Sequence, residues 1–173
     1  AGDMDNDGDT DIIATALNDD EVIVYTNETS GLATASFVSN TITTAADGAQ
    51  SVFSIDVDSD GDMDIISASY YDDKIAWYKN NGAINPTFTS INISTNADGA
   101  TSVFAADMDN DGDIDIISSS GDDNTIAWYE NDGTANPSWS AADIATSADG
   151  AYSVFAADMD NDGDMDIVSA SVN

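Results

Sequence analysis

The stretch that decides the fold is Asp56-Val-Asp-Ser-Asp-Gly-Asp-Met-Asp64, nine residues in which aspartate fills every odd position and glycine the sixth. The same pattern begins again at Asp3, Asp107 and Asp158, so that it recurs every 51 to 53 residues. Twenty of the 34 acidic residues lie in these four loops. Carboxylates at this density repel one another unless a cation holds them together. The pattern therefore predicts a repeat protein whose loops bind metal ions.

Calcium is the ion that this pattern favours. It takes roughly six to eight oxygen ligands at about 2.3–2.6 Å, whereas magnesium prefers a rigid octahedron and retains water. Side chains at positions one, three and five of the loop project inward, glycine at six permits the sharp turn, and the carbonyl of position seven and the carboxylate of position nine close the shell. We expect one calcium ion in each loop, four in all. The predicted metal-binding residues are Asp3, Asp5, Asp7, Asp9, Asp11, Asp56, Asp58, Asp60, Asp62, Asp64, Asp107, Asp109, Asp111, Asp113, Asp115, Asp158, Asp160, Asp162, Asp164 and Asp166.

An EF-hand and a merely solvated acidic turn both fit these loops poorly. An EF-hand needs glutamate at position twelve and flanking helices, but that position holds Ala14, Ser67, Ser118 or Ser169. Solvated turns, or a surface made acidic for solubility, give no reason for one five-aspartate spacing to recur four times. We expect the metal to be structural, because its binding free energy becomes folding free energy.

The residues between the loops predict short strands and no helix. Ile65-Ile66 and Ile75–Tyr78 place apolar residues on both alternating faces, which is typical of a sheet packed between two neighbours. Four strands in about 51 residues match a β-propeller blade. The predicted strands of the second unit are 51–55, 65–69, 74–78 and 87–93, with turns at 72–73 and 97–100.

The fold prediction is an all-β, β-propeller-type array of four-stranded antiparallel blades. We read residues 1–173 as a single repeat region, with a partial unit at 1–50, units at 51–101 and 102–152, and a partial unit at 153–173. Propellers usually need at least about four blades, so we expect an incomplete propeller or part of a larger assembly, formed by a longer polypeptide or by several copies. A β-trefoil is a weaker alternative, because it does not explain the hairpin loops. The start at Ala1 suggests a processed protein or an excerpt.

Composition excludes several classes of function. A net charge of −32, with Lys74 and Lys79 as the only basic residues, opposes nucleic-acid binding. No apolar run reaches membrane-spanning length. Histidine is absent, which removes the usual general base, and cysteine is absent, so stability cannot come from disulfides. Each acidic cluster repeats with the blade, so we predict no catalytic residues and no enzyme.

The aromatic residues are expected to pack between units. Trp77 and Trp128 recur at the same place in an apolar strand, and Trp139 occupies the place of a phenylalanine in the other units. Tyr70-Tyr71 lies at a turn and is not repeated, which makes it a candidate for ligand contact.

The Asp-x-Asp-x-Asp-Gly-Asp-x-Asp loop, the following Ile-Ile-Ser-Ala-Ser of residues 65–69 and the Ile-Ala-Trp-Tyr-Lys-Asn-Asn-Gly of residues 75–82 resemble FG-GAP/VCBS-type repeats. These are similar to the calcium-binding blades of integrin α-subunit propellers and of secreted bacterial surface proteins. The resemblance covers essentially the whole chain. It implies calcium sites on the rim of a propeller, usually of about seven blades, and an extracellular setting. It implies no single activity, because the fold serves adhesins, lectins and some polysaccharide lyases.

The leading hypothesis is a non-enzymatic, extracellular calcium-binding β-propeller module with a structural or adhesive role, recognising protein or glycan. One alternative is a self-assembling extracellular fibre or oligomer subunit, since near-identical units with unpartnered end sheets invite pairing. Another is the propeller portion of a carbohydrate-active enzyme. The expected partners are calcium, a protein or glycan ligand, and either further copies or the continuation of a longer chain.

Overall fold

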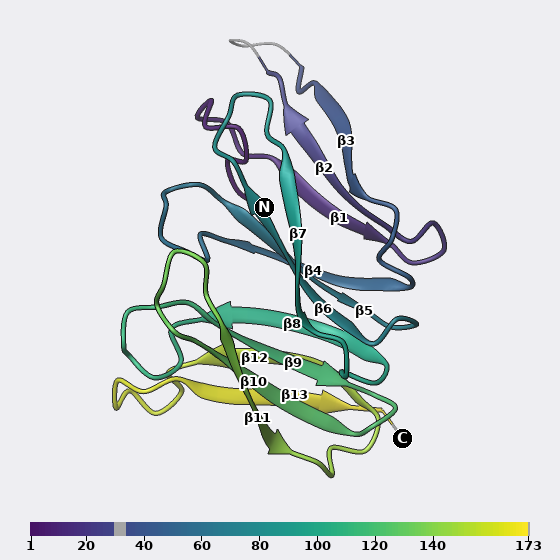
Figure 1. The fold of residues 1–173 in the computed structure, drawn as a ribbon, viewed down its shortest axis with the longest axis vertical. Coiled ribbons are helices and arrows are strands. Elements are labelled where there is room, and N and C mark those ends of the chain that lie inside the picture. Colours follow the sequence, from purple (N-terminus) through teal and green to yellow (C-terminus); the bar gives the residue numbers. More distant parts are fainter. Residues whose placement is uncertain (30–33, 173) are drawn as a thin grey trace.

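The computed structural model describes residues 1–29 and 34–172, and in them the regular structure consists of thirteen antiparallel strands in four separate sheets (Figure 1). The all-β prediction is confirmed, and the sheets do not close into a ring, as in an incomplete propeller. The first sheet contains β1 (Ile12–Ala16), β2 (Glu21–Asn27) and β3 (Phe37–Thr43). The second contains β4 (Ala49–Ile55), β5 (Asp64–Ser69), β6 (Lys74–Asn80) and β7 (Phe88–Ser94). The third contains β8 (Ala100–Ala106), β9 (Asp115–Ser120), β10 (Thr125–Asn131) and β11 (Trp139–Ala145), and the fourth contains β12 (Ala151–Ala157) and β13 (Asp166–Ser171).

Each sheet is a meander, because strands that follow one another in sequence pair side by side. The strands predicted for the second unit are confirmed to within two residues at either end. The predicted unit boundaries remain a prediction, and their ranges include residues 30–33 and 173, which lie outside the described residues.

The core lies between sheets and not within one sheet. All six residues of β5 and of β9 are buried, because each strand is covered on both faces. Ile65 packs against Val22 and Val24 of the first sheet, whereas its neighbour Ile66 packs in the cluster that includes Ile116 of the third. This confirms the expectation that strands without alternating polarity are packed between two sheets.

The strand that opens each full sheet contacts its counterpart in the next sheet, β4 against β8 and β8 against β12. Phe53, Phe104 and Phe155 lie at the same place in these strands and form a continuous stack. Their ring centroids are 4.8 Å and 4.6 Å apart, and the rings are tilted by about 50°. Such tilted pairs add to the stability gained from burial alone.

All four acidic loops lie at the same end of the sheets (Figure 1). The second, third and fourth loops each connect the first strand of a sheet to the second, and the first loop leads into β1. The same end of the sheets also carries the β6–β7 and β10–β11 connections. The tight turns after β5 and β9 lie at the opposite end of the sheets. The part of the chain that the structure describes contains no helix with the length and apolar character that crossing a membrane requires.

Candidate metal centres

The four loops share one backbone conformation, which their sequence dictates. In the second loop the carboxylate of Asp56 accepts hydrogen bonds from the backbone N–H of Asp60 and of Gly61, at 3.1 and 2.9 Å. Gly61 has a φ of 94°, where a side chain is strained. The residue at position four, Ser59 here and asparagine elsewhere, is also left-handed. The chain therefore curls around the first aspartate before it enters β5.

This curl brings three carboxylates of each loop together. In the second loop these are Asp56, Asp58 and Asp64, whose nearest oxygen atoms all lie within 4.8 Å of one another. Positions one, three and nine also meet in the first and fourth loops, and positions one, three and five meet in the third. The clusters are Asp3, Asp5 and Asp11; Asp56, Asp58 and Asp64; Asp107, Asp109 and Asp111; and Asp158, Asp160 and Asp166.

The aspartates at position seven stand outside these clusters. The carboxylates of Asp62 and Asp164 instead accept hydrogen bonds from asparagine side chains of the preceding loop, Asn6 at 2.8 Å and Asn110 at 3.2 Å. For position seven, the sequence analysis assigned only the backbone carbonyl to the metal. The side chain of that aspartate can therefore link adjacent loops. The ligand role of all twenty aspartates stays a prediction.

The aspartate at position nine fastens the loop to the neighbouring strand. Asp64 is fully buried, and its two oxygen atoms accept hydrogen bonds from the backbone N–H of Asn80 at 2.7 Å and of Val57 at 3.2 Å. Burial raises the pKa of Asp64 to about 7, although these hydrogen bonds oppose the shift. Burial also raises the pKa of Asp115, its counterpart in the third loop. A buried carboxylate of this kind is stabilised in its charged form by a nearby cation.

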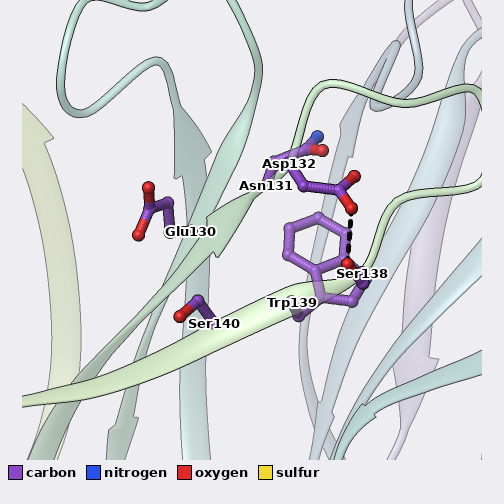
Figure 2. Close-up of a pocket in the computed structure, with 6 residues that line it drawn as sticks. All are labelled: Glu130, Asn131, Asp132, Ser138, Trp139 and Ser140. Carbon is purple, nitrogen blue, oxygen red and sulfur yellow. Dashed lines mark hydrogen bonds between the residues drawn. The ribbon is translucent and has the colours of Figure 1, made fainter.

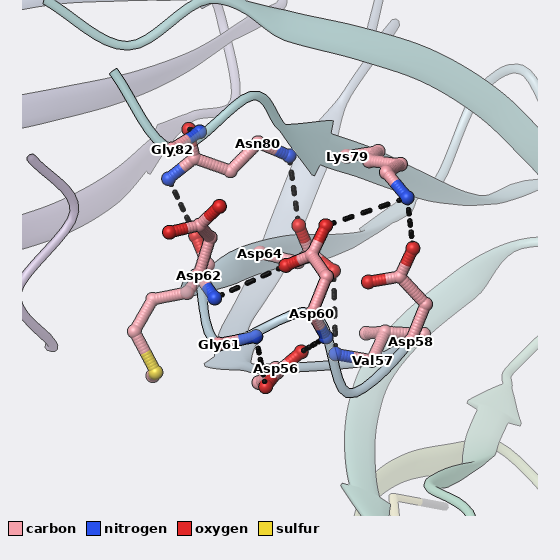
Figure 3. Close-up of polar contacts among 11 residues, drawn as sticks. Asp56, Val57, Asp58, Asp60, Gly61, Asp62, Asp64, Lys79, Asn80 and Gly82 are labelled. Carbon is pink, nitrogen blue, oxygen red and sulfur yellow. Dashed lines mark hydrogen bonds and ion pairs between the residues drawn. The ribbon is translucent and has the colours of Figure 1, made fainter. Parts of the chain in front are cut away.

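In the second loop, only one of the two oxygen atoms of the buried Asp58 carboxylate has a partner in the part of the chain that the structure describes (Figure 3). Its side chain is only 1% exposed, and its Oδ1 is buried with no hydrogen-bond partner among residues 1–29 and 34–172. Its Oδ2 accepts a hydrogen bond from the ammonium group of Lys79, and this contact raises the pKa of the lysine. An unpartnered carboxylate oxygen inside a cluster of three carboxylates fits a hard divalent cation with oxygen ligands. Asp56, Asp58 and Asp64 would hold that ion.

Two buried asparagines belong to the site and were missed by sequence reasoning. The side-chain amide of Asn80 donates to the carbonyls of Met63 in its own loop and of Met4 in the preceding loop, at 3.0 and 2.9 Å. Asn131 makes the equivalent pair of bonds in the third sheet. The signal was available, since asparagine recurs sixteen residues after position nine. Adjacent loops are thus joined through their backbones.

Comparison with known protein families matches the FG-GAP-like repeat over residues 3–67, 56–118 and 107–169. The chain belongs to the FG-GAP-like repeat family. The resemblance drawn from the loops is therefore confirmed, and each match runs from one acidic loop into the strand that follows the next. No curated protein matches the chain.

FG-GAP-like repeats are typically non-catalytic. One pocket outside the loops is lined by acidic residues. This pocket, of about 310 Å³, lies beside Trp139 and is lined by Glu130, Asp132 and Ser138 among others (Figure 2). The hydroxyl groups of Ser138 and Thr134 hold the pKa of Asp132 down to about 2, so this group cannot act as a general acid near neutral pH.

The tryptophans lie where packing was expected. Trp77 is buried, and Trp139 meets it edge-on, with ring centroids 6.5 Å apart. The tyrosine pair at the turn after β5 lies at the opposite end from the loops. Tyr70 donates a hydrogen bond to Asp122 at 2.7 Å, whereas Tyr71 is 65% exposed. Ligand contact at this pair stays a prediction.

Proposed function

We propose that this FG-GAP-like repeat chain is a calcium-binding, propeller-like module that acts outside the cell in a structural or adhesive role. Calcium would neutralise the carboxylate cluster of each loop and fix the end of the stacked sheets. The exposed surface would recognise a protein or a glycan.

The observation that carries this proposal is the recurrence of a three-carboxylate cluster in all four loops. Asp58, enclosed and with one oxygen unpartnered, is independent support, because an isolated buried carboxylate oxygen is costly. Extracellular modules bind calcium with dissociation constants of about 10⁻⁴–10⁻³ M, and a chain with a net charge of −32 is suited to that calcium-rich setting.

Calcium titration tests the metal part of the proposal. At free calcium of about 100 times the dissociation constant, each site adds about 2.7 kcal/mol to the free energy of unfolding. We expect calorimetry to count four ions for the wild type and three for Asp58→Asn, with a smaller calcium-induced rise in Tm. Asp143→Asn, on exposed β11, makes the same change in charge and should leave the count at four. Unchanged Tm and no bound calcium in the wild type would contradict the proposal.

The adhesive role needs a separate test, because metal binding alone does not require it. Calcium-loaded chain should bind some members of a glycan array or an extracellular protein panel, and a chelator should release it. Binding to glycans alone would favour a lectin-like role. No binding to either panel would reduce the proposal to a structural one.

Self-association is a second candidate, and the exposed end faces favour it. Val57 and Ile66 are buried against the next sheet, but their counterparts are exposed: Met159 in the fourth loop by 61% and Val168 in the fourth sheet by 43%. At the other end Ile12 is exposed, although its counterpart Ile65 is buried. The two faces therefore present the two halves of an interface that the chain already uses internally, and either a second copy or the continuation of a longer chain would fit them. Light scattering should show multimers that Val168→Asp disperses, and a monomer at all concentrations would exclude this candidate.

A further inference from the structure

The second loop differs from the others in having a lysine beside it. Lys79 is the last residue but one of β6, and its register partner on β7 is Thr89. Its ammonium group forms ion pairs with Asp58 and, at 3.5 Å, with Asp60 (Figure 3). The same Nζ lies 5.8 Å from the ring centroid of Trp77, at the edge of cation–π range.

The corresponding residues of the neighbouring sheets carry different charges. Thr26 and Glu130 precede the asparagines that fasten the first and third loops, just as Lys79 precedes Asn80. The position that corresponds to Lys79 therefore holds a neutral residue in the first sheet, a cation in the second and an anion in the third. The chain has only two basic residues against 34 acidic ones. A lysine beside a metal cluster therefore has a large effect on the local charge.

Lys79 occupies only half of the carboxylate that it contacts. It binds Oδ2 of Asp58, and Oδ1 of the same group is buried and unpartnered. Asp58 and Asp60 are two of the carboxylates expected to bind the metal. An ion entering the cluster must therefore either displace the ammonium group or bind within a few ångströms of it.

We propose that Lys79 is a built-in counter-cation of the second loop, which holds the loop together without metal and weakens its affinity for calcium. The first three sites then fill in an order set by the residue at this position, with the second loop filling after the first and third. This inference rests on the proposed calcium function. An ammonium group about 5 Å from a divalent ion weakens its binding by about tenfold, even at the dielectric constant of water.

The order of filling can be measured loop by loop on the full chain. The glycine at position six of each loop, Gly8, Gly61, Gly112 or Gly163, has a backbone amide whose NMR signal should move when that loop binds calcium. In the wild type we expect the Gly61 signal to reach its midpoint at about tenfold higher calcium than those of Gly8 and Gly112. In Lys79→Thr, which introduces the residue found beside the first loop, the Gly61 midpoint should fall about tenfold.

Two further variants separate the effect of position from that of charge. Lys74→Thr removes the other lysine, which binds Asp72 and the carbonyl of Ala45 at the opposite end of the sheet. It makes the same change in net charge and should leave the Gly61 midpoint in place. Glu130→Lys exchanges an anion for a cation and should raise the Gly112 midpoint by more than tenfold. In chelator, Lys79→Thr should have a lower Tm than the wild type, which a purely competitive lysine would not cause.

The outcomes distinguish this inference from the function on which it rests. If none of the four glycine signals responds to calcium, the proposed calcium function fails. If all four respond but Gly61 titrates together with Gly8 and is unmoved by Lys79→Thr, calcium binding stands and the role of Lys79 is overturned. An equal shift in Lys74→Thr would also overturn it, because the cause would then be net charge alone.

Discussion

Asp64 gives the most direct quantitative test of the loop structure. Burial raises its pKa from the ordinary value of 3.8 to about 7. A carboxyl group whose pKa rises on folding stabilises the folded state in its protonated form. That contribution is complete below pH 3.8 and is lost as the pH rises through about 7. In chelator, the free energy of unfolding should therefore increase from about pH 8 to about pH 5, opposite to the usual acid denaturation.

The magnitude follows from the size of the pKa change. One pKa unit is worth about 1.4 kcal/mol, so the full change is about 4 kcal/mol, and about 2.5 kcal/mol of it falls between pH 8 and pH 5. Replacing Asp64 with alanine removes this part of the pH dependence. Other aspartates with raised pKa values, such as Asp5 and Asp115, keep their own share in the variant.

Urea unfolding followed by tryptophan fluorescence at pH 5 and pH 8 measures the effect, because Trp77 is buried in the core. The gain in free energy of unfolding should be smaller by about 2.5 kcal/mol in Asp64→Ala than in the wild type. Asp166→Ala is the matched control, since Asp166 holds the same loop position but is exposed. Saturating calcium should also abolish the gain at Asp64, because the metal then takes the place of the proton. An equal pH dependence in wild type and Asp64→Ala would refute the reasoning.

Three further predictions concern the packing around the loops. Phe104→Ala should lower the free energy of unfolding by about 3–5 kcal/mol, and Phe155→Ala by clearly less, because Phe155 is half-exposed and stacks on one ring only; urea unfolding measures both. Asn131→Ala removes the donor to two loop carbonyls and should cost about 1–3 kcal/mol; equal stability would exclude a bridging role. Gly82→Ala places a methyl group 2.0 Å from a loop carboxylate, whereas Gly61→Ala meets open space, so a thermal melt should show the greater loss for Gly82 although both residues have positive φ.

The strand order could be predicted because it depends on local patterns that repeat. The loop pattern fixed where strands end and begin, and apolar pairs such as Ile65-Ile66 indicated sheets covered on both faces. The outcome depends little on distant residues, since a chain with this pattern can bury both faces of β5 only by stacking sheets.

The polar network between loops could not be predicted in the same way. The bonds from Asn80 to Met4 and from Asn6 to Asp62 join residues more than fifty positions apart, and they depend on how adjacent sheets are offset. The linear pattern also suggested that all loops gather the same carboxylates. In the third loop, however, the third member of the cluster is Asp111 at position five, whereas in the other loops it is the aspartate at position nine.

The third and fourth loops show how much of a metal centre lies outside its own nine residues. Their sequences differ only at the eighth position, Ile114 against Met165. Yet Asp115 is buried and accepts hydrogen bonds from two backbone N–H groups, whereas Asp166 is exposed and accepts one, from Met159. The second donor of the third loop comes from the end of β10, the strand that pairs with β9. Because a preorganised carboxylate binds an ion more tightly than a free one, in a chain of residues 1–173 alone the fourth loop should bind calcium more weakly than the third despite its matching sequence. The Gly163 and Gly112 amide signals measure the two affinities in one titration, and equal midpoints would show that the loop alone sets the affinity.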